Sequence, residues 1–177
     1  SYTGLALRSE EIVNASESGL INYYIKDASK VGSGDLICSI DTDGSIARQI
    51  NSANEDSSEL NADNLTQIQE LIQEYSGSYE KESFYNVYTF KDDLNAEISE
   101  ALSMNALNGI SDAVTAAEGN ATFHKETAVR DGIVVYYTDG FESVTAENFT
   151  ADVFDESRYN KTNLKDQSEI ASGDAIY

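Results

Sequence analysis

Two stretches near opposite ends of the sequence follow one pattern, and such a repeat constrains the fold more than any single motif. Residues 19–24 and 132–137 are each a glycine followed by a β-prone run that ends in two tyrosines. Further along the chain, residues 31–37 and 170–176 share the pattern apolar-x-Ser-Gly-Asp-x-Ile. The same two motifs therefore occur twice, in the same order.

Each copy predicts a strand, a turn and a second strand. Gly34 and Gly173 occupy the turns, where glycine adopts backbone conformations that a residue with a Cβ resists. A single hairpin is only marginally stable in water. We therefore expect the two halves to pack as one quasi-symmetric β-sandwich, with tyrosines alternating between core and surface. The two ends of the chain are then expected to meet in space.

The second copy is longer than the first. Gly34 follows Gly19 by 15 positions, whereas Gly173 follows Gly132 by 41, so the second half carries an insert at about 138–166. We expect an ordered loop there, with a short helix near 145–148, and favour local packing over a partner surface. The insert contains four aromatic residues that this prediction concerns: Phe141, Phe149, Phe154 and Tyr159.

Between the two halves, apolar residues at helical spacing predict two helices. The first spans about 58–75, with Ser58 as the expected N-cap and Gly77 just beyond the end. Its apolar stripe consists of Leu65, Ile68, Leu71, Ile72 and Tyr75.

The second helix is expected over about 91–118, stopped by Gly119, with a length of roughly 40 Å at about 1.5 Å per residue. Its many small residues allow a neighbour to approach closely, so we expect an antiparallel helical hairpin. The aromatic-rich connection at 79–90 is interpreted as an ordered hairpin tip or a strand-like segment that folds back. The stripe consists of Leu94, Ile98, Ala101, Leu102, Ala106, Ile110, Ala113 and Ala117.

The charge of the chain excludes some classes of partner. Eleven Lys and Arg stand against 32 Asp and Glu, for a formal net charge of -21. Such a surface repels both the phosphate backbone of nucleic acids and anionic lipid headgroups. Nucleic acid is therefore not an expected partner, and the carboxylates are interpreted as a solvated surface.

Residues 41–44, Asp-Thr-Asp-Gly, resemble part of a calcium-binding loop. With Gly44 in the glycine position, Ser39 and Ile50 fall at the first and twelfth ligand positions, where carboxylates are needed. A turn that ends the first β-half explains the same residues better. The sequence therefore predicts no metal site here.

No other residue pattern indicates chemistry. His124 is the only histidine, too few for a histidine metal site or a robust Ser-His-Asp triad, and is interpreted as structural or exposed. Cys38 is the only cysteine and is expected to be buried and inert. Gly32 and Gly34 are not followed by the helix of a phosphate-binding loop. We therefore predict no catalytic, cofactor-binding or metal-ligating residues, and no enzyme.

The two halves resemble those of a biotinyl/lipoyl-type domain. With the helical hairpin between them, they are similar to the barrel-sandwich hybrid of HlyD-type membrane-fusion, or periplasmic adaptor, proteins, especially a Gram-positive branch related to the RND adaptors. The resemblance implies an α+β fold, a split lipoyl/biotinyl-like barrel-sandwich hybrid interrupted by an antiparallel α-helical hairpin. It rests on residues 10–13 leading into 18–21, and on 30–36, 131–134 and 172–177.

The same resemblance implies three parts and a function. Residues 1–45 and 119–177 form the two halves of the barrel-sandwich hybrid, and 46–118 form the hairpin insertion. The chain is then expected to be a non-catalytic extracytoplasmic adaptor of an efflux or secretion transporter. Its expected partners are a membrane transporter, other envelope proteins and copies of itself, with membrane contact only through an anchor outside this chain.

Two other functions compete with this reading. A structural cell-envelope or division-associated protein could use the same scaffold without a transport role. A swinging-arm carrier would need a cofactor-bearing lysine at the turn between the halves. No lysine lies between Lys30 and Lys81, which argues against the carrier.

Overall fold

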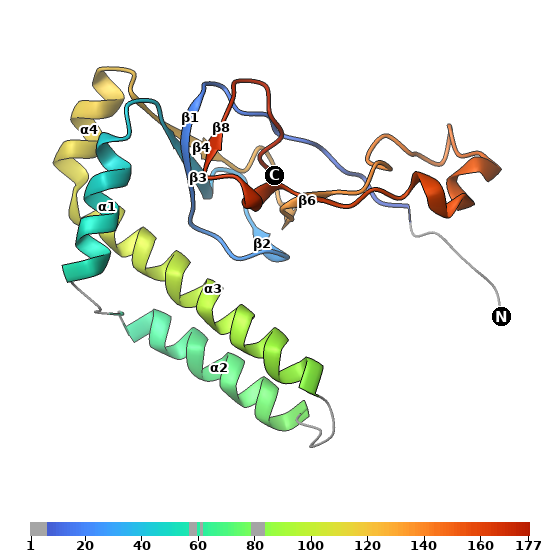
Figure 1. Ribbon diagram of the computed structural model, residues 1–177, viewed down its shortest axis with the longest axis horizontal. Coiled ribbons are helices and arrows are strands. Elements are labelled where there is room, and N and C mark those ends of the chain that lie inside the picture. Colours follow the sequence, from blue (N-terminus) through green and yellow to red (C-terminus); the bar gives the residue numbers. More distant parts are fainter. Residues whose placement is uncertain (1–6, 57–59, 61, 79–83) are drawn as a thin grey trace.

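The computed structural model describes residues 7–56, 60, 62–78 and 84–177, and shows a β-domain with a helical segment between its two halves (Figure 1). The first half contains β1 (Gly19–Tyr23), β2 (Ser29–Val31) and β3 (Leu36–Asp41). The helical segment contains α1 (Ser45–Asp56), α2 (Ala62–Ser78), α3 (Phe84–Gly109) and α4 (Ser111–Gly119). The second half contains β4 (Phe123–Thr127), β5 (Gly132–Val134), β6 (Tyr137–Thr138), β7 (Thr162–Asn163) and β8 (Glu169–Ile170). The predicted α+β fold is confirmed.

The two halves interlock through their strands. The four-stranded sheet has the order β4-β3-β1-β8, so its inner strands come from the first half and its outer strands from the second. In a further sheet β2 pairs with β5, again one strand from each half. Because strand backbones need partners for their N–H and C=O groups, neither half can complete its hydrogen bonding alone.

The two Ser-Gly-Asp turns are held by equivalent hydrogen bonds, which confirms the repeat. Gly34 and Gly173 have φ angles of 91° and 92°, in the left-handed region that favours glycine. The N–H of Gly34 donates to the carbonyl of Ala128, and the N–H of Gly173 donates to that of Ala15, at 2.8 and 2.9 Å. Ala128 and Ala15 occupy the same position in the two copies. Each turn therefore docks on the other half.

The core lies between the sheets and draws on both halves. Ile37, Cys38 and Ile40 of the inner strand β3 have no exposed surface. Residues 13–15 pair with 174–177 through backbone hydrogen bonds, so the expected meeting of the two end segments is found there. The remaining buried members of the core are Ala15, Ile21, Tyr23, Ala128, Val134, Tyr136, Ile170 and Ile176.

Helices α2 and α3 form the expected antiparallel hairpin, but their bounds differ from the prediction (Figure 1). Gly77 lies inside α2 rather than beyond it, and the expected N-cap Ser58 lies outside the described residues. α3 begins at Phe84, so the later part of the aromatic connection is helical. Tyr75 and Phe90 stack across the hairpin with ring centroids 4.1 Å apart, and this packing favours a helix there.

Two features of the helical segment were not predicted. α1 forms because Ile46 and Ile50, one helical turn apart, are both buried against the β-domain. The helix expected at 91–118 is interrupted at Ile110, whose φ of -111° and ψ of 31° are not helical. α3 and α4 are therefore separate helices joined by one residue.

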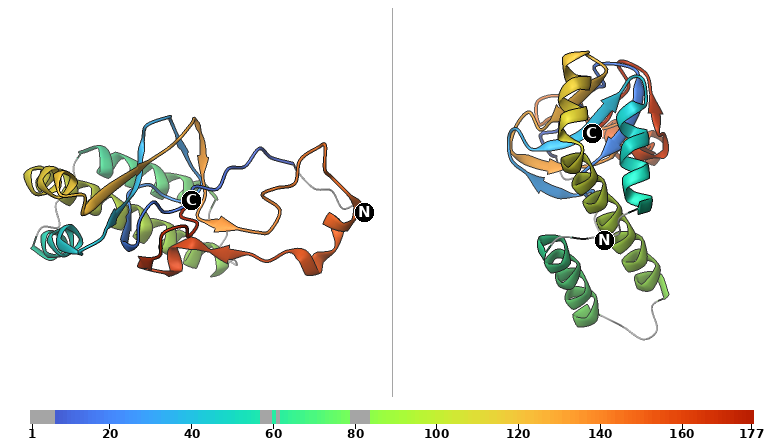
Figure 2. Two further views of the ribbon diagram at one scale, coloured as in Figure 1. Left: turned by 90° about the horizontal axis from the view of Figure 1, so that it is seen from above. Right: turned by 90° about the vertical axis from the view of Figure 1, so that its left-hand side faces the viewer.

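The insert leaves the β-domain through the paired strands β6 and β7. It contains the 3-10 helices η1 (Ala151–Phe154) and η2 (Glu156–Arg158), and η3 (Leu164–Asp166) follows β7. The prediction of a short helix at 145–148 is wrong. Thr145 and Asn148 instead close a turn, in which the side chain of each accepts the other's N–H. The insert and the hairpin project from the β-domain in different directions (Figures 1 and 2).

Candidate functional site

An apolar base anchors the helical segment to the β-domain. It joins α1, α4 and the last turn of α3 to side chains of the sheet. Burying one large apolar side chain contributes about 1.5–3 kcal/mol. The base therefore fixes the point at which the hairpin leaves the β-domain. Its buried members are Tyr24, Ile46, Ile50, Leu107, Val114, Ala117 and Phe123.

Asp41, the last residue of β3, caps α1. Its side chain is buried, and its two oxygens accept the N–H groups of Gly44 and Ala47 at 3.0 and 2.7 Å. A carboxylate at a helix N-terminus satisfies free N–H groups and interacts favourably with the helix dipole. The residues that resemble a calcium loop thus connect strand to helix. The side-chain oxygen of Ser39 lies 2.7 Å from the hydroxyl oxygen of Tyr24, so Ser39 makes a hydrogen bond within the fold.

The other residues weighed from the sequence are not brought together. Cys38 is in the core, and burial raises the pKa of its thiol. His124 is half-buried on β4, with Nε2 3.1 Å from the carbonyl oxygen of Ala121. Within the described ranges, no three His, Cys, Asp or Glu side chains are grouped so that they could hold a metal ion.

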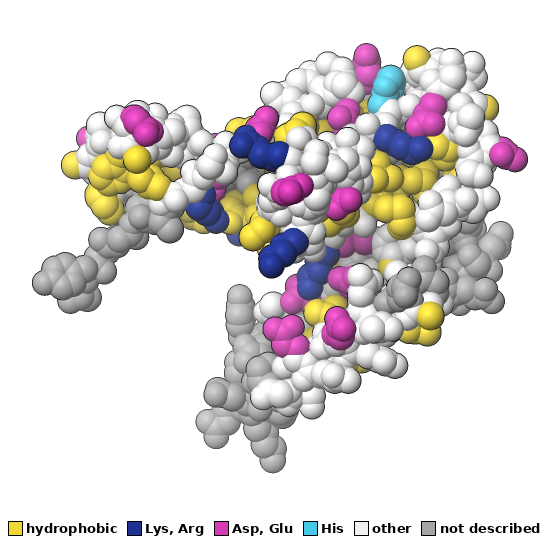
Figure 3. Space-filling model, turned by 180° about the vertical axis from the view of Figure 1, so that it is seen from behind, with side chains coloured by type: hydrophobic (Ala, Val, Ile, Leu, Met, Phe, Trp, Pro, Cys, Tyr) yellow, Lys and Arg dark blue, Asp and Glu magenta, His cyan; other side chains and the backbone are white. Residues whose placement is uncertain are grey.

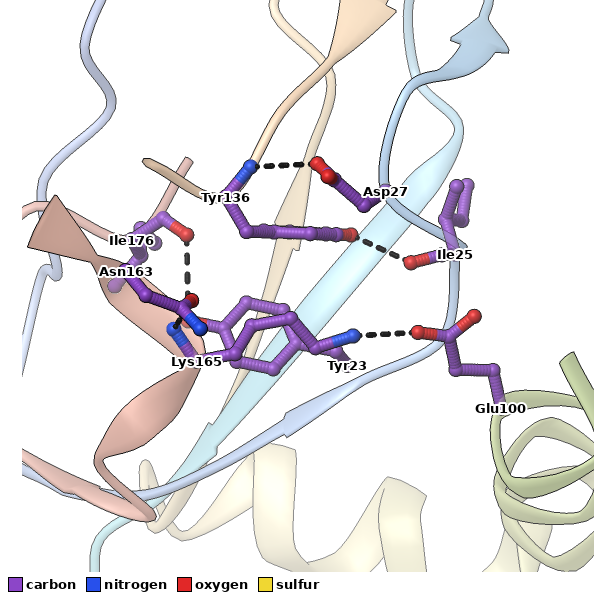
Figure 4. A network of polar contacts seen from close by, with 8 residues as sticks. All are labelled: Tyr23, Ile25, Asp27, Glu100, Tyr136, Asn163, Lys165 and Ile176. Carbon is purple, nitrogen blue, oxygen red and sulfur yellow. Dashed lines mark hydrogen bonds and ion pairs between the residues drawn. The ribbon is translucent and has the colours of Figure 1, made fainter. Parts of the chain in front are cut away.

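A second contact between the hairpin and the β-domain is polar (Figure 4). Lys165 on η3 places its Nζ 2.5 Å from Oε1 of Glu100 on α3. The same ammonium group lies over the rings of Tyr23 and Tyr136, at 5.1 and 4.7 Å from their centroids. One lysine therefore contacts the hairpin and both halves of the β-domain.

Tyr23 and Tyr136 occupy the same position in the two copies of the repeat. Their rings meet edge to face with centroids 4.7 Å apart. Tyr23 donates its hydroxyl to the carbonyl of Ile176 at 3.3 Å, and Tyr136 donates to that of Ile25 at 2.8 Å. Burial raises the pKa of both tyrosines, which keeps them neutral. The repeat thus supplies both walls of an aromatic site for a lysine, a contact worth about 0.5–2 kcal/mol.

Within this network, the position of Glu100 is energetically unfavourable, because its carboxylate is buried and only partly paired. Its side chain is only 9% exposed, and its Oε2 accepts no hydrogen bond from the residues that the structure describes. Loss of solvation raises its pKa, opposed by Lys165. A buried carboxylate that is only partly paired costs several kcal/mol, so the contact orients the hairpin more than it stabilises the fold.

The junction of the two halves runs from a strand straight into a helix. β3 passes through a bend at 42–44 directly into α1, where a carrier domain would need its lysine. Residues 10–177 match the family described as RND related, barrel-sandwich hybrid domain. The chain belongs to this family.

Two solved structures are similar to this barrel-sandwich hybrid. One is the crystal structure of ZneB from Cupriavidus metallidurans, 16% identical over 93% of this chain and 60% of that chain, with a TM-score of 0.27. The other is the crystal structure of MacA from Actinobacillus actinomycetemcomitans, 20% identical over 93% of this chain and 48% of that chain, with a TM-score of 0.26. The chain thus spans only part of each. No curated protein matches the sequence.

Exposed apolar side chains mark two surfaces of the barrel-sandwich hybrid and its hairpin. The hairpin surface consists of Leu65, Ile72, Val87 and Tyr88, of which Tyr88 is 66% exposed. The insert surface consists of Phe149, Phe154 and Tyr159. Figure 3 shows hydrophobic side chains gathered on the insert and acidic side chains on the hairpin. Among the described residues, no helix is long and apolar enough to cross a membrane.

The insert aromatics also contact one another, as the sequence reading favoured. Phe149 meets Phe154 edge to face at 5.6 Å, and Phe141 stacks with Tyr159 at 6.5 Å between ring centroids. Lys161 lies 4.2 Å from the centroid of the Tyr137 ring. Local packing and exposure therefore coexist in the insert.

A groove of about 470 Å³ lies between the extended segment 8–13 and residues 128–135 of the barrel-sandwich hybrid. Ile12, Val129 and Ile133 line it and are exposed. Such a groove offers apolar contact area, with the carboxylates of Glu10 and Glu11 also in its lining.

We expect the stability of this domain to depend on pH through Glu100. Because its pKa is raised from the ordinary 4.5, the folded state binds the proton more tightly than the unfolded chain. This contribution to stability is therefore present below the ordinary pKa and is lost as pH rises through the raised one. The groups that face Glu100 are Asp93 and Glu97 on α3, Lys26 and Asp27 after β1, Tyr136 after β5, and Lys165 on η3.

Urea unfolding of the wild type and of Glu100→Gln, from about pH 4 to about pH 7, measures this effect. Glutamine keeps the size of the side chain but does not titrate, so the other carboxylates cancel in the comparison. The difference in unfolding free energy, wild type minus variant, should fall as pH rises. A difference that stays flat or rises would contradict the prediction.

Proposed function

We propose that this chain is a non-catalytic part of an extracytoplasmic adaptor for an efflux or secretion transporter. The observation that carries the proposal is the helical hairpin at the junction of the two β-halves. A hairpin braced on the β-domain presents the sides of its helices to another protein. Membership of the RND-related family supports the same role.

The hairpin surface is the proposed contact with the partner. Residues 46–118 contain fourteen Asp and Glu against three Lys and Arg. Four apolar side chains are exposed among these carboxylates, and apolar anchors surrounded by charge are typical of protein interfaces. The charge favours a partner surface with basic residues around an apolar centre.

Three finer statements are part of the same proposal. The full-length protein is held at the membrane by an anchor outside these residues, and it belongs to a Gram-positive branch of the family. The division into 1–45, 46–118 and 119–177, with the insert at about 138–166, describes its parts. The resemblance in sequence supports each of them.

The proposal predicts that Tyr88→Ala weakens assembly. Exposed tyrosines at the centre of an interface typically contribute about 2 kcal/mol, which corresponds to more than a tenfold loss of affinity. The measurement is affinity purification of the tagged full-length protein from solubilised membranes, with the co-purifying transporter quantified by mass spectrometry. The wild type should recover a transporter, and Tyr88→Ala should recover at least about tenfold less.

Tyr159→Ala is the matched control, because it removes an equally large exposed side chain from the insert surface. It should leave recovery unchanged. Loss of the transporter with Tyr159→Ala instead of Tyr88→Ala would move the contact to the insert. A membrane-anchored wild type that recovers only cell-wall or division proteins would overturn the transport role and favour the structural one.

A further inference from the structure

The hairpin is held to the barrel-sandwich hybrid at two places of different chemistry. Near the end of α3, Leu107 belongs to the apolar base. From Leu107 toward the tip of the hairpin, the buried side chains of α3 that the structure describes are Ser103, Ala101 and Glu100. Met104 is partly buried against the apolar base. Beyond the base, the fully buried contacts of α3 are therefore made by small side chains and one ion pair.

The connection at the base allows a change of direction. α3 and α4 are joined only by Ile110, which leaves the helical conformation. A Cβ placed on the preceding Gly109 would meet no atom within 4 Å, so the chain there is not enclosed. Ile110 itself is partly buried against the apolar base, so the helix break lies at this base. A one-residue break there is a pivot for the hairpin, because Leu107 lies close to it and moves far less than the tip.

We propose that Lys165 is a releasable strap, which holds the hairpin beside the barrel-sandwich hybrid and lets it turn about Ile110 when the contact with Glu100 opens. The strap is built from both copies of the repeat, since the ammonium group contacts the rings of both Tyr23 and Tyr136. Figure 4 shows the ammonium group reaching from η3 past these rings to the carboxylate on α3.

Two features of the structure allow the contact between Lys165 and Glu100 to open. The second oxygen of Glu100 is buried without a partner among the described residues, so opening the contact restores its hydration. A cavity of about 420 Å³ adjoins the ion pair and is lined by Lys26, Asp27 and Asp93, so α3 is not closely packed at this point. Opening the contact therefore costs little apolar packing.

The strap also couples the insert to the hairpin. Asn163 on β7 accepts the N–H of Lys165 at 3.0 Å, and the N–H of Leu164 donates to the carbonyl of Tyr136 at 2.9 Å. The position of Lys165 is thus set where the insert returns to the β-domain. A displacement of the insert would shift the lysine, and the direction of the hairpin would follow.

The distance between the hairpin and the β-domain tests the strap. Nitroxide labels are placed at Gln73→Cys on α2 and Lys30→Cys on β2, both exposed positions, in the complete chain. The native Cys38 is fully buried and is not expected to react. Pulsed electron paramagnetic resonance should give one narrow distance distribution with Lys165. Lys165→Ala should broaden it and shift part of the population to longer distances.

Lys161→Ala is the control, because it removes a lysine of the same insert that lies over another ring, Tyr137. It should leave the distribution narrow. Glu100→Gln carries the test if Lys165→Ala does not fold, and it should broaden the distribution in the same way. Wild-type distributions in folded Lys165→Ala or Glu100→Gln would overturn the strap. The test involves no partner, so its failure would leave the proposed adaptor role untouched.

Discussion

Gly19→Ala is expected to lower the free energy of unfolding by at least about 3 kcal/mol, the upper end of what overpacking costs. A Cβ at this position would lie 2.5 Å from the carbonyl oxygen of Asp41 and 3.0 Å from the Cα of Thr42. Both are backbone atoms, and Asp41 is fixed by its two capping hydrogen bonds. β1 is also enclosed between β3 and β8, so it cannot move aside.

Gly132→Ala is the matched control, because Gly132 begins the second copy of the same motif. A Cβ there would meet no atom within 4 Å, since β5 pairs on one side only. Alanine should therefore be neutral, or stabilise by up to about 1 kcal/mol through the unfolded chain. Urea unfolding followed by tyrosine fluorescence measures both variants. Equal losses at the two positions would show that the clash at Gly19 does not exist.

The repeat could be predicted because the interactions that form each of its turns join residues close together in sequence. A glycine at positive φ and an aspartate that accepts a nearby N–H leave a recognisable pattern within a few residues, as at Gly34 and Gly173. The same pattern did not reveal that a Cβ would clash at Gly19 but not at Gly132. That difference depends on strand order, which brings residues far apart in sequence into contact.

The helical boundaries were missed where tertiary packing decides them. The alanine-rich periodicity runs through Ile110 without a break, and the glycine just before it, Gly109, was not taken as the end of a helix. α1 left one signal that could have been used, the spacing of Ile46 and Ile50 just after Gly44. The Asp-Thr-Asp-Gly sequence was interpreted as a turn that ends the first β-half, and the chain does bend at 42–44, but the helix that starts at Ser45 was not predicted.

The contact between Glu100 and Lys165 could not have been found from the sequence. The two residues lie 65 positions apart, on elements of different type. Glu100 is one of fourteen carboxylates in the helical segment, and only burial distinguishes it from the others. Tyr23 and Tyr136 could be recognised in the sequence as equivalent residues of the repeat. Their shared contact with Lys165 could not, because it depends on how the insert folds.

The second large effect is expected for Asp41→Ala, which should lower the free energy of unfolding by about 2–4 kcal/mol. The buried carboxylate accepts the N–H groups of Gly44 and Ala47, and hydrogen bonds to a charged group are worth more than neutral ones. Alanine would leave both donors unpaired at the N-terminus of α1. Because Ile46 and Ile50 follow directly, fraying of this end would also loosen the apolar base.

Asp43→Ala distinguishes capping from mere loss of a carboxylate. Asp43 is exposed and accepts the N–H of Ser45 at 2.9 Å, and hydrogen bonds from Ser45, first from its hydroxyl, lower the pKa of this carboxyl. The surrounding water can replace that partner, so the variant should lose far less unfolding free energy than Asp41→Ala. Urea unfolding gives both free energies, and amide exchange at Ala47 reports on α1 itself. Exchange at Ala47 that accelerates in Asp41→Ala but not in Asp43→Ala would assign the effect to the cap. Equal exchange in the two variants would mean that the apolar base alone holds the start of the helical segment.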